Sequence, residues 1–332
     1  MKEIVSRNTN VDLLRAIGLL LIILAHVNAP DIIKQIRCFD VPMMLFISGL
    51  CGAKKSSFPY LSVVWKRVKR LIIPVWLFLF LYIPVLYLFQ SLDIIPSIVD
   101  LEYIFDSFFL NRNGGVGYVW IIRIFILITI VSPFLVSIVN KINNAASLLF
   151  VIIIGLISLE VFFQYFSRFN RGYSQSFIYE FIMPIIAYSI PYIIGMFCTM
   201  DKKISLKKTA SVIVLLGIYV LFINLLTDSF SINSFKYPPR ALYVAYGALM
   251  SVFLWSCLNR QNKQIKFLLF IGRNTIWIYL YHIPFTLFAN QFISIWCLQY
   301  LFIFFFSLSS FYLQYRFVKN SSHQFVKKYL VG

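Results

Sequence analysis

The chain has 332 residues, of which 60% are hydrophobic, 18% are aromatic and only 13% are charged. Soluble domains carry about 25% charged residues, and a chain of this length has too little interior to bury so much apolar surface. The composition therefore excludes a soluble enzyme, a disordered chain and a disulfide-stapled domain, and the net charge of +18 does not indicate nucleic-acid binding, which needs a water-facing basic patch. We expect an all-α, polytopic membrane protein.

Ten apolar stretches are candidates for membrane spans, each of which needs about 20 residues as a helix. The first has no small-residue cleavage site, so we expect it to remain as a span and not to be a signal peptide. The second is short and contains Asp40 and Pro42, which makes it the least regular. The ten stretches are residues 11–28, 37–53, 71–90, 118–139, 146–164, 178–199, 209–227, 237–258, 266–289 and 292–314.

The distribution of Lys and Arg predicts the orientation of these spans. With the N-terminus in the cytoplasm, 20 of the 30 basic residues fall in cytoplasmic segments and 7 in outer segments, which follows the enrichment of cytoplasmic loops in basic residues. Both termini are therefore predicted to be cytoplasmic, with residues 91–117 as the longest outer loop. We expect one domain over residues 1–332, with no fused soluble domain. The five cysteines are scattered and form neither a disulfide framework nor a zinc pattern.

The first span contains Asp12, Arg15 and His26. Ionisable residues inside a span are costly and usually face a polar cavity. Asp12 and Arg15 are three residues apart and can pair on one helix face. In a continuous helix Arg15 and His26 would point the same way, about 16 Å apart along the axis. The alternative is a snorkelling arginine with an interfacial histidine, but the alignment favours one shared cavity.

A basic run, Trp65 to Arg70, precedes the third span. It can be a stop-transfer flank or a clamp for phosphate groups, because guanidinium forks match phosphate oxygens. Arg67 and Arg70 would share one face if the helix extends towards the cytoplasm.

Four further residues have both a structural and a functional interpretation. Arg123 lies a turn and a half into the fourth span, where snorkelling with Trp120 as an interfacial anchor is the alternative to a functional role. His282 lies inside the ninth span, where a hydrogen-bonded structural histidine is the main alternative. Ser48, next to Gly49, is typical of a helix-packing pair. The sequence shows no phosphate-binding glycine loop, nucleophile elbow or metal-spaced His/Glu pair.

Taken in order, several segments resemble the membrane-bound acyltransferase 3 family, and the match extends over almost the whole chain. The segments are Asp12 to Gly18 with Leu24-Ala25-His26, Val41 to Leu50, the basic run ending at Arg70, Tyr118 to Arg123, Tyr237-Pro238-Pro239, and Ile271 to Thr275 with Tyr279 to His282.

The resemblance implies transfer of an acyl group, usually acetyl, from cytoplasmic acyl-CoA to a hydroxyl of an extracytoplasmic glycan or its lipid-linked precursor. It implies that Arg15 and His26 are essential, with His26 as general base or acyl relay. By position, Asp12 would orient Arg15. The basic residues before the third span would bind the acyl-CoA, which assigns that role to Arg67, Arg70 and Lys69.

The outer end of the site is expected to include supporting residues for the acceptor, namely Arg123, Trp120, Asp40, Ser48 and His282. Asp40 stands where the family often has histidine or a small residue, and Met43 and Met44 replace residues commonly seen as Leu and Phe, so the acceptor stays open. We expect no metal and no bound cofactor, with acetyl-CoA as co-substrate.

The expected partners are acyl-CoA, the glycan acceptor and membrane lipids, with envelope glycan-assembly proteins as further candidates and no nucleic acid. The expected location is the bacterial inner or plasma membrane. The alternative function is a transporter or flippase of lipid-linked glycan, which would also use buried charges but would show more spans or paired repeats.

Overall fold

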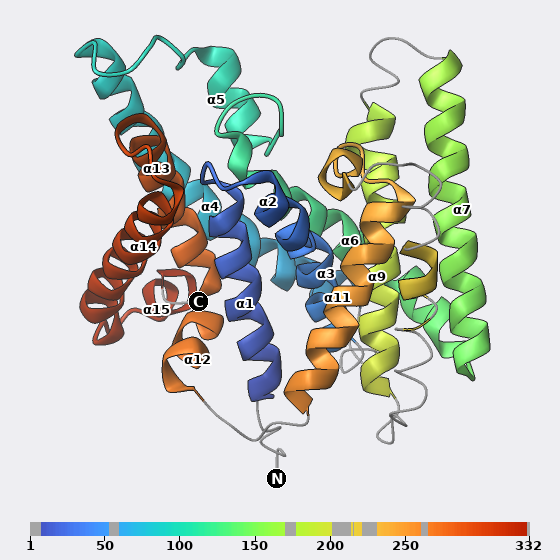
Figure 1. The fold of residues 1–332 in the computed structure, drawn as a ribbon. Coiled ribbons are helices and arrows are strands. Elements are labelled where there is room, and N and C mark those ends of the chain that lie inside the picture. The colour runs from blue at the N-terminus through green and yellow to red at the C-terminus, as the bar shows by residue number, and fades with distance from the viewer. Residues whose placement is uncertain are drawn as a thin grey trace. The chain divides into compact units, whose positions relative to one another are not determined.

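The computed structural model describes residues 8–52, 60–169, 177–200, 214, 216–220, 231–259 and 265–330. These described residues form helices and connecting turns, with no strand, as the sequence predicts. The elements in chain order (Figure 1) are α1 (Thr9–Ala25), α2 (Asp31–Arg37), α3 (Asp40–Gly52), α4 (Tyr60–Ser91), α5 (Leu101–Phe108), η2 (Gly117–Val119), α6 (Trp120–Asn140), α7 (Ala145–Phe169), the π-helical turn η3 (Ile178–Ile182), α9 (Met183–Met200), η4 (Ile232–Phe235), α11 (Ala241–Asn259), α12 (Lys266–Arg273), α13 (Thr275–Phe292), α14 (Trp296–Lys319) and α15 (Gln324–Leu330).

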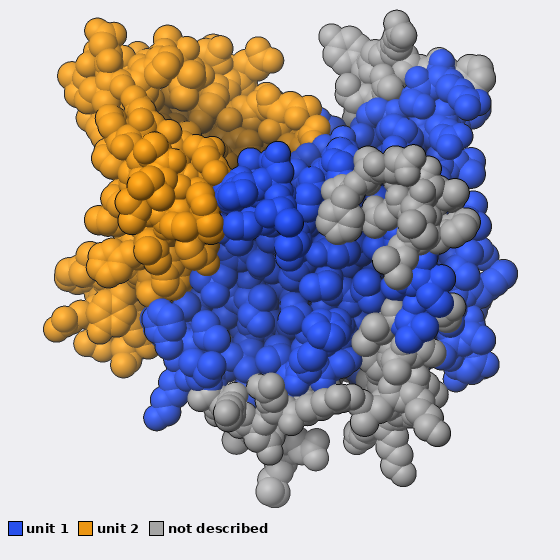
Figure 2. Space-filling view, viewed as in Figure 1, with its two compact units in different colours: residues 1–25, 29–58, 131–273 blue, residues 26–28, 59–130, 274–332 orange. Residues whose placement is uncertain are grey.

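The chain divides into two compact units, shown in different colours in Figure 2. The first unit comprises residues 1–25, 29–58 and 131–273, and the second comprises residues 26–28, 59–130 and 274–332. Each unit is therefore assembled from segments that are far apart in the sequence.

Among the described residues, six helices are long and apolar enough to cross a membrane, as expected of a multi-pass membrane protein. They correspond to the predicted third, fourth, fifth, sixth, eighth and tenth spans. Within the described residues, α9 is the most buried of the six, whereas α7 and α14 are the least buried. The exposed apolar faces of α7 and α14 are suited to lipid, because a helix satisfies its backbone hydrogen bonds internally. The six helices cover Tyr60–Ser91, Gly117–Asn140, Ala145–Arg168, Ile178–Thr199, Ala241–Leu258 and Trp296–Lys319.

The other predicted spans differ from the helices that form. The second, residues 37–53, corresponds to α3, whose 13 residues reach about 20 Å, which is short of a bilayer core of about 30 Å. The ninth is divided at Asn274, whose φ of −123° and ψ of 29° leave the helical region, as asparagine does readily. The seventh, residues 209–227, lies largely outside the described residues.

In the first unit, α3 packs closely against α9 through glycines. A Cβ atom on Gly49 would lie 2.1 Å from the carbonyl oxygen of Tyr192, and one on Gly195 would lie 2.1 Å from that of Phe46. Small residues allow such backbone approach between membrane helices. The predicted packing role of the Ser48-Gly49 pair is thus confirmed at Gly49, and Ser48 is buried beside it.

A third glycine joins α1 to α12 in the same unit. A Cβ atom on Gly272 would lie 1.8 Å from the carbonyl oxygen of Asp12, so only glycine allows the two helices to approach this closely at that position. α1 also packs against α3 and α11, and its side chains Leu14 and Ala16 are fully buried. The first predicted span therefore forms an interior helix of its unit.

In the second unit, α13 packs along α14, and α4 and α15 contact this pair. The indole Nε1 of Trp277 in α13 donates to the carbonyl oxygen of Tyr329 in α15 at 2.8 Å. These contacts fix α13, which carries His282.

Candidate functional site

Four rings gather in the second unit and form what we call the imidazole cluster: His26, Tyr118, Tyr279 and His282. His26 is half-buried, in the turn that follows α1. Its ring centroid lies 4.7 Å from that of Tyr118, edge to face, and 5.2 Å from that of His282. The ring of Tyr279 lies 5.0 Å from that of His282. The structure thus places two imidazoles that are 256 positions apart in the sequence against each other.

The hydrogen bonds of His282 define its protonation pattern. Its Nδ1 is hydrogen-bonded to the carbonyl oxygen of Tyr279, and because a carbonyl can only accept, Nδ1 carries the proton. Nε2 of the neutral ring then has a lone pair that can accept a hydrogen bond. This Nε2 is buried and has no hydrogen-bond partner within the part of the chain that the structure describes, which is uncommon for a polar atom in a protein interior.

Tyrosine hydroxyls surround the same cluster. The hydroxyl of Tyr279 donates to the carbonyl oxygen of Tyr118. Tyr82 of α4 lies near Tyr118, and its own hydroxyl is buried with no hydrogen-bond partner among the described residues. In α5, burial together with Tyr118 raises the pKa of Tyr103 to about 12, so this hydroxyl stays neutral at physiological pH. The surroundings of His26 therefore combine neutral hydrogen-bonding groups with apolar ring faces.

The segment that carries His26 is tied to the connection between α13 and α14. The backbone N–H of Asn28 donates to Oε1 of the fully buried Gln299 at 2.8 Å, and Nε2 of Gln299 donates to the carbonyl oxygen of Ile293 at 2.7 Å. The side-chain amide of Asn290 donates to the carbonyl oxygen of His26 at 3.3 Å. The backbone of His26 is thus held by polar contacts on both sides.

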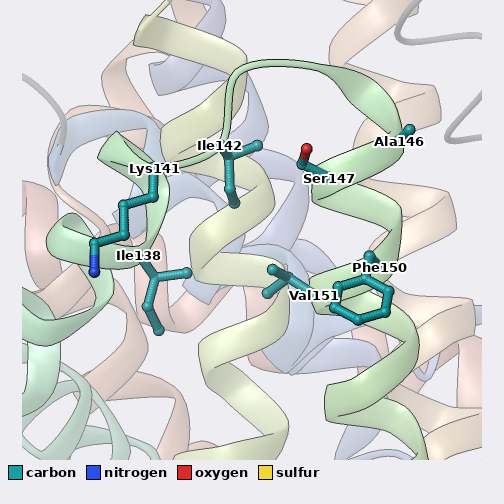
Figure 3. A pocket seen from close by; sticks show the side chains of 7 residues that line it. All are labelled: Ile138, Lys141, Ile142, Ala146, Ser147, Phe150 and Val151. Atoms are coloured by element: carbon teal, nitrogen blue, oxygen red, sulfur yellow. The ribbon is translucent and has the colours of Figure 1, made fainter.

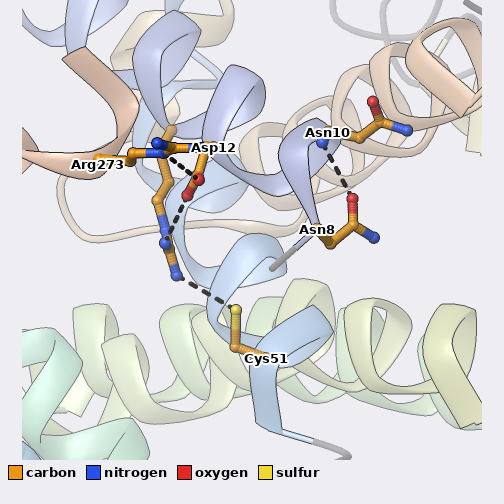
Figure 4. A network of polar contacts seen from close by, with 6 residues as sticks. Asn8, Asn10, Asp12, Cys51 and Arg273 are labelled. Atoms are coloured by element: carbon orange, nitrogen blue, oxygen red, sulfur yellow. Dashed lines mark hydrogen bonds and ion pairs between the residues drawn. The ribbon is translucent and has the colours of Figure 1, made fainter. Parts of the chain in front are cut away.

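A second polar network, which we call the Asp12 network, lies in the first unit (Figure 4). Nη1 of Arg15 contacts Oδ1 of Asp12 at 3.1 Å, and Nη2 donates to Sγ of Cys51 at 3.3 Å. Nε of Arg273 contacts Oδ2 of Asp12 at 3.5 Å. The Asp12 side chain is 1% exposed, whereas that of Arg15 is 29% exposed. Two cations around one carboxylate leave a net positive charge, which suits an anionic ligand.

The predicted pairing of Asp12 with Arg15 is confirmed by this contact. The helix α1 ends at Ala25, one residue before His26, so the predicted alignment of Arg15 with His26 on one shared cavity stays a prediction. Arg15 makes its contacts in the first unit, and His26 makes its ring contacts in the second.

The predicted acyl-CoA clamp lies on α4. This helix begins at Tyr60, so Arg67 and Arg70 lie on one continuous helix and share a face. Arg67 is half-buried and Arg70 is exposed. Lys69 has its Nζ 4.6 Å from the ring centroid of Trp65, one turn back along the helix and away from Arg67, because residues two apart do not share a face.

Arg123 anchors the segment that precedes α6 in the second unit. It is 7% exposed, and its Nη1 donates to Oδ1 of Asn111 at 2.9 Å. Asn111 in turn donates to Oδ1 of Asp106 at 2.6 Å. Trp120 is the first residue of α6 and is half-buried. This chain of contacts positions the segment before α6, which begins at Trp120, two residues after Tyr118.

Asp40 is the centre of a buried ion cluster in the first unit. Its carboxylate contacts Nη1 of Arg37 at 3.0 Å and Nζ of Lys236 at 3.3 Å, and all three side chains are buried. Burial alone would lower the pKa of Lys236, but the Asp40 carboxylate and Tyr237 outweigh it and raise the pKa above its ordinary value. The Asp40 carboxylate is thus engaged in two ion pairs.

A cavity of about 480 Å³ lies between the end of α6 and the start of α7 (Figure 3). Its walls are apolar except for Lys141 and Ser147, and it contains none of the predicted site residues. Among the described residues, no group of three His, Cys, Asp or Glu side chains is placed to hold a metal ion. Ile138, Ile142, Ala146, Phe150 and Val151 complete the lining of the cavity.

Sequence reasoning omitted several residues that the structure brings to these two networks. Tyr118, Tyr279 and Arg273 stand in the quoted segments, and an arginine within a predicted span was the available signal for Arg273. Gln299 and Asn290 carried no local signal, since their role depends on contacts with a segment more than 260 positions away.

Comparison with known proteins gives one match. A family model described as an acyltransferase domain matches residues 8–316, which include both networks and most of each unit. No curated protein and no solved structure matches the chain.

Proposed function

The chain belongs to the acyltransferase 3 family, and on that premise we propose that it transfers an acetyl group from cytoplasmic acetyl-CoA to a hydroxyl of an extracytoplasmic glycan or its lipid-linked precursor. The family establishes a membrane acyltransferase. The donor, the acceptor and the residue roles described below are the proposal.

The observation that carries the proposal is the imidazole cluster around His26. A sugar hydroxyl is a weak nucleophile at neutral pH and needs a positioned base. His26 takes the hydroxyl proton while the oxygen attacks the thioester carbonyl; the new C–O bond forms, the C–S bond breaks, and the proton leaves with the CoA thiolate. In the relay variant, a nitrogen of His26 first accepts the acyl group and then passes it to the hydroxyl.

The cationic groups supply the donor site of the proposal. CoA carries phosphate groups, which bind best to the planar fork of arginine. Arg67 and Arg70 provide two such forks on one face of α4. In the first unit, the guanidinium of Arg15 is held by Asp12 and Cys51 and is still partly exposed, so it can also contact an anion.

The alternative of a flippase for lipid-linked glycan rests on buried charges and a basic cytoplasmic face, which an acyltransferase shares. The family match favours acyl transfer. The proposed location is the bacterial inner or plasma membrane, with the glycan acceptor, membrane lipids and envelope glycan-assembly proteins as the proposed partners.

The test measures acetyl transfer directly. Inside-out membrane vesicles containing the protein receive acetyl-labelled acetyl-CoA, and label is counted in the lumenal glycan fraction. We expect label there with the protein and none in vesicles without it. If the glycan acquires no acetyl group while its transport across the membrane depends on the protein, the flippase alternative replaces the proposal.

A further inference from the structure

The deeply buried His282 faces the half-buried His26. Its Nε2 has no hydrogen-bond partner among the described residues and can serve the proton transfer proposed for His26. We propose that His282 is a positioning residue whose Nε2 accepts a hydrogen bond from the protonated form of His26, directly or through one water. This inference rests on the proposed function for its chemical meaning, but its geometry and its test do not require turnover.

The first support is the tautomer of His282. Because Nδ1 donates to the carbonyl oxygen of Tyr279, Nε2 is the nitrogen with the available lone pair. This atom is buried and has no hydrogen-bond partner among the described residues. Leaving an acceptor buried and unpaired costs free energy, so its retention indicates a partner at some stage of the protein's cycle.

The second support is the spacing of the two rings. Their centroids lie 5.2 Å apart with an interplanar angle of 31°, which is about the separation that one N–H···N hydrogen bond of about 2.9 Å between two imidazoles requires. Rotation of the half-buried His26 side chain, or one bridging water, is sufficient to complete the contact. His282 cannot rotate in the same way, because its Nδ1 is already bonded to α13.

The third support is the absence of a competing charge at His282. The titratable groups that the structure places against its ring are His26, Tyr118 and Tyr279, and Tyr82 on α4 lies beyond Tyr118. Among the described residues, burial and the hydrogen bond to the backbone of Tyr279 are the influences on the protonation of His282, and no charged side chain is among them. Tyr118 and His282 both face the ring of His26.

The consequence concerns the proton that His26 takes from the acceptor hydroxyl. A hydrogen bond made to the protonated form of a group stabilises that form. His282 would therefore hold the imidazolium of His26 in place until the proton leaves with the CoA thiolate. Without the acceptor at Nε2, His26 becomes a weaker base and binds its proton only at lower pH.

The chain contains three histidines, so the titration of His26 can be followed without turnover. Diethyl pyrocarbonate reacts with neutral imidazole, and mass spectrometry of the peptides gives the rate at each residue as a function of pH. His323 is exposed and serves as the internal reference. His282→Asn and His282→Gln form a matched pair, because Gln can place an oxygen near the position of Nε2 whereas the shorter Asn cannot.

We expect His282→Asn to lower the midpoint of the His26 reaction by about one pH unit, and His282→Gln to leave it near that of the wild type. Thr286→Val serves as the packing control, because Thr286 is equally buried in α13 and its hydroxyl bonds only the backbone carbonyl of His282; it should cause no shift. His282→Phe, which keeps the ring volume, takes the place of the Asn variant if that variant does not insert.

An unchanged midpoint in His282→Asn, or equal shifts in the Asn and Gln variants, overturns the inference and leaves His282 as a packing residue. In the acetyl-transfer assay, the acidic limb of the pH profile of kcat/KM should move with the midpoint. If the wild type transfers no acetyl group, the proposed function fails, while the chemical titration still decides whether His282 acts on His26.

Discussion

The carboxylate of Asp40 holds two buried cations, Arg37 and Lys236, which gives this residue a structural role, and its part in the acceptor pocket stays a prediction. Removing one partner of a buried ion pair leaves an uncompensated charge in the interior. We expect Asp40→Asn to lower the free energy of unfolding by about 3–5 kcal/mol. Thermal unfolding of the detergent-solubilised protein measures the change.

Asp31→Asn is the control for this prediction, because Asp31 also pairs with a lysine but its side chain is 92% exposed, and an exposed pair contributes little. It should leave the unfolding temperature unchanged. A wild-type unfolding temperature in Asp40→Asn would show that the two cations do not depend on this carboxylate.

Residue-scale prediction succeeded where the signal was local. The i,i+3 spacing predicted the contact of Asp12 with Arg15, because helix geometry alone determines it. It did not predict that Arg273 shares the same carboxylate or that His282 lies against His26. Those contacts depend on which helices pack together, and hydrophobic patterns of membrane helices specify this poorly.

At the scale of elements, the approach of α1 to α12 depends on the absence of a side chain at Gly272. A methyl group there would lie 1.8 Å from the carbonyl oxygen of Asp12 and would force the helices apart, with an overpacking cost of about 1–3 kcal/mol. We expect Gly272→Ala to lower the unfolding temperature and also the activity, because the same shift moves Asp12 and Arg273. Both are measured on the purified protein.

Gly217→Ala provides the matched control. A Cβ atom at Gly217 meets nothing within 4 Å, and alanine is favoured over glycine in a helix, so this variant should be as stable as the wild type or slightly more so. If Gly272→Ala and Gly217→Ala have the same unfolding temperature, the close approach of α1 and α12 does not contribute to stability.

The cytoplasmic start of α4 gives a second prediction at this scale. We expect Arg67→Gln with Arg70→Gln to raise KM for acetyl-CoA at least about tenfold, because each charge-assisted hydrogen bond contributes about 1.5–3 kcal/mol, while kcat changes less. Steady-state kinetics with varied donor concentration measures this. The control is Lys319→Gln, which removes one positive charge at the end of α14, where the lysine lies over the ring of Tyr315. It should leave KM unchanged.

An unaltered KM in the double variant, accompanied by a changed membrane orientation, would instead identify the basic run as a topological signal. The sequence left this choice open because both roles use the same residues. The continuous helix from Tyr60 to Ser91 supports the shared face but does not by itself distinguish the two roles.

At the scale of the whole molecule, composition was sufficient to predict an all-α membrane protein, and six helices of the described residues meet the length and apolarity of a span. The predicted first, second and ninth spans depart from a straight 20-residue helix. The first is an interior helix ending at Ala25, and the ninth breaks at Asn274. Hydropathy measures how apolar a stretch is but not whether its helix is continuous, so it does not predict such breaks.

The predicted orientation can be tested with reporter fusions. Green fluorescent protein fluoresces only in the cytoplasm, so a fusion at the C-terminus should fluoresce. Alkaline phosphatase is active only outside the cytoplasm, so an insertion at residue 100, in the loop before α5, should be active. Activity of the phosphatase at the C-terminus would contradict the predicted topology, because it requires either an odd number of spans or a reversed orientation of all ten.

The central claim is that His26 performs the chemistry of acyl transfer, and one comparison tests it most directly. Labelled acetyl-CoA is added to vesicles that contain His26→Ala or His323→Ala at equal protein content and equal membrane insertion. His323→Ala is the control, because it removes an exposed histidine outside the site. We expect His26→Ala to lose at least about 100-fold in transfer rate, as removal of a general base does, and His323→Ala to retain the wild-type rate. Full transfer by correctly inserted His26→Ala would contradict the mechanism.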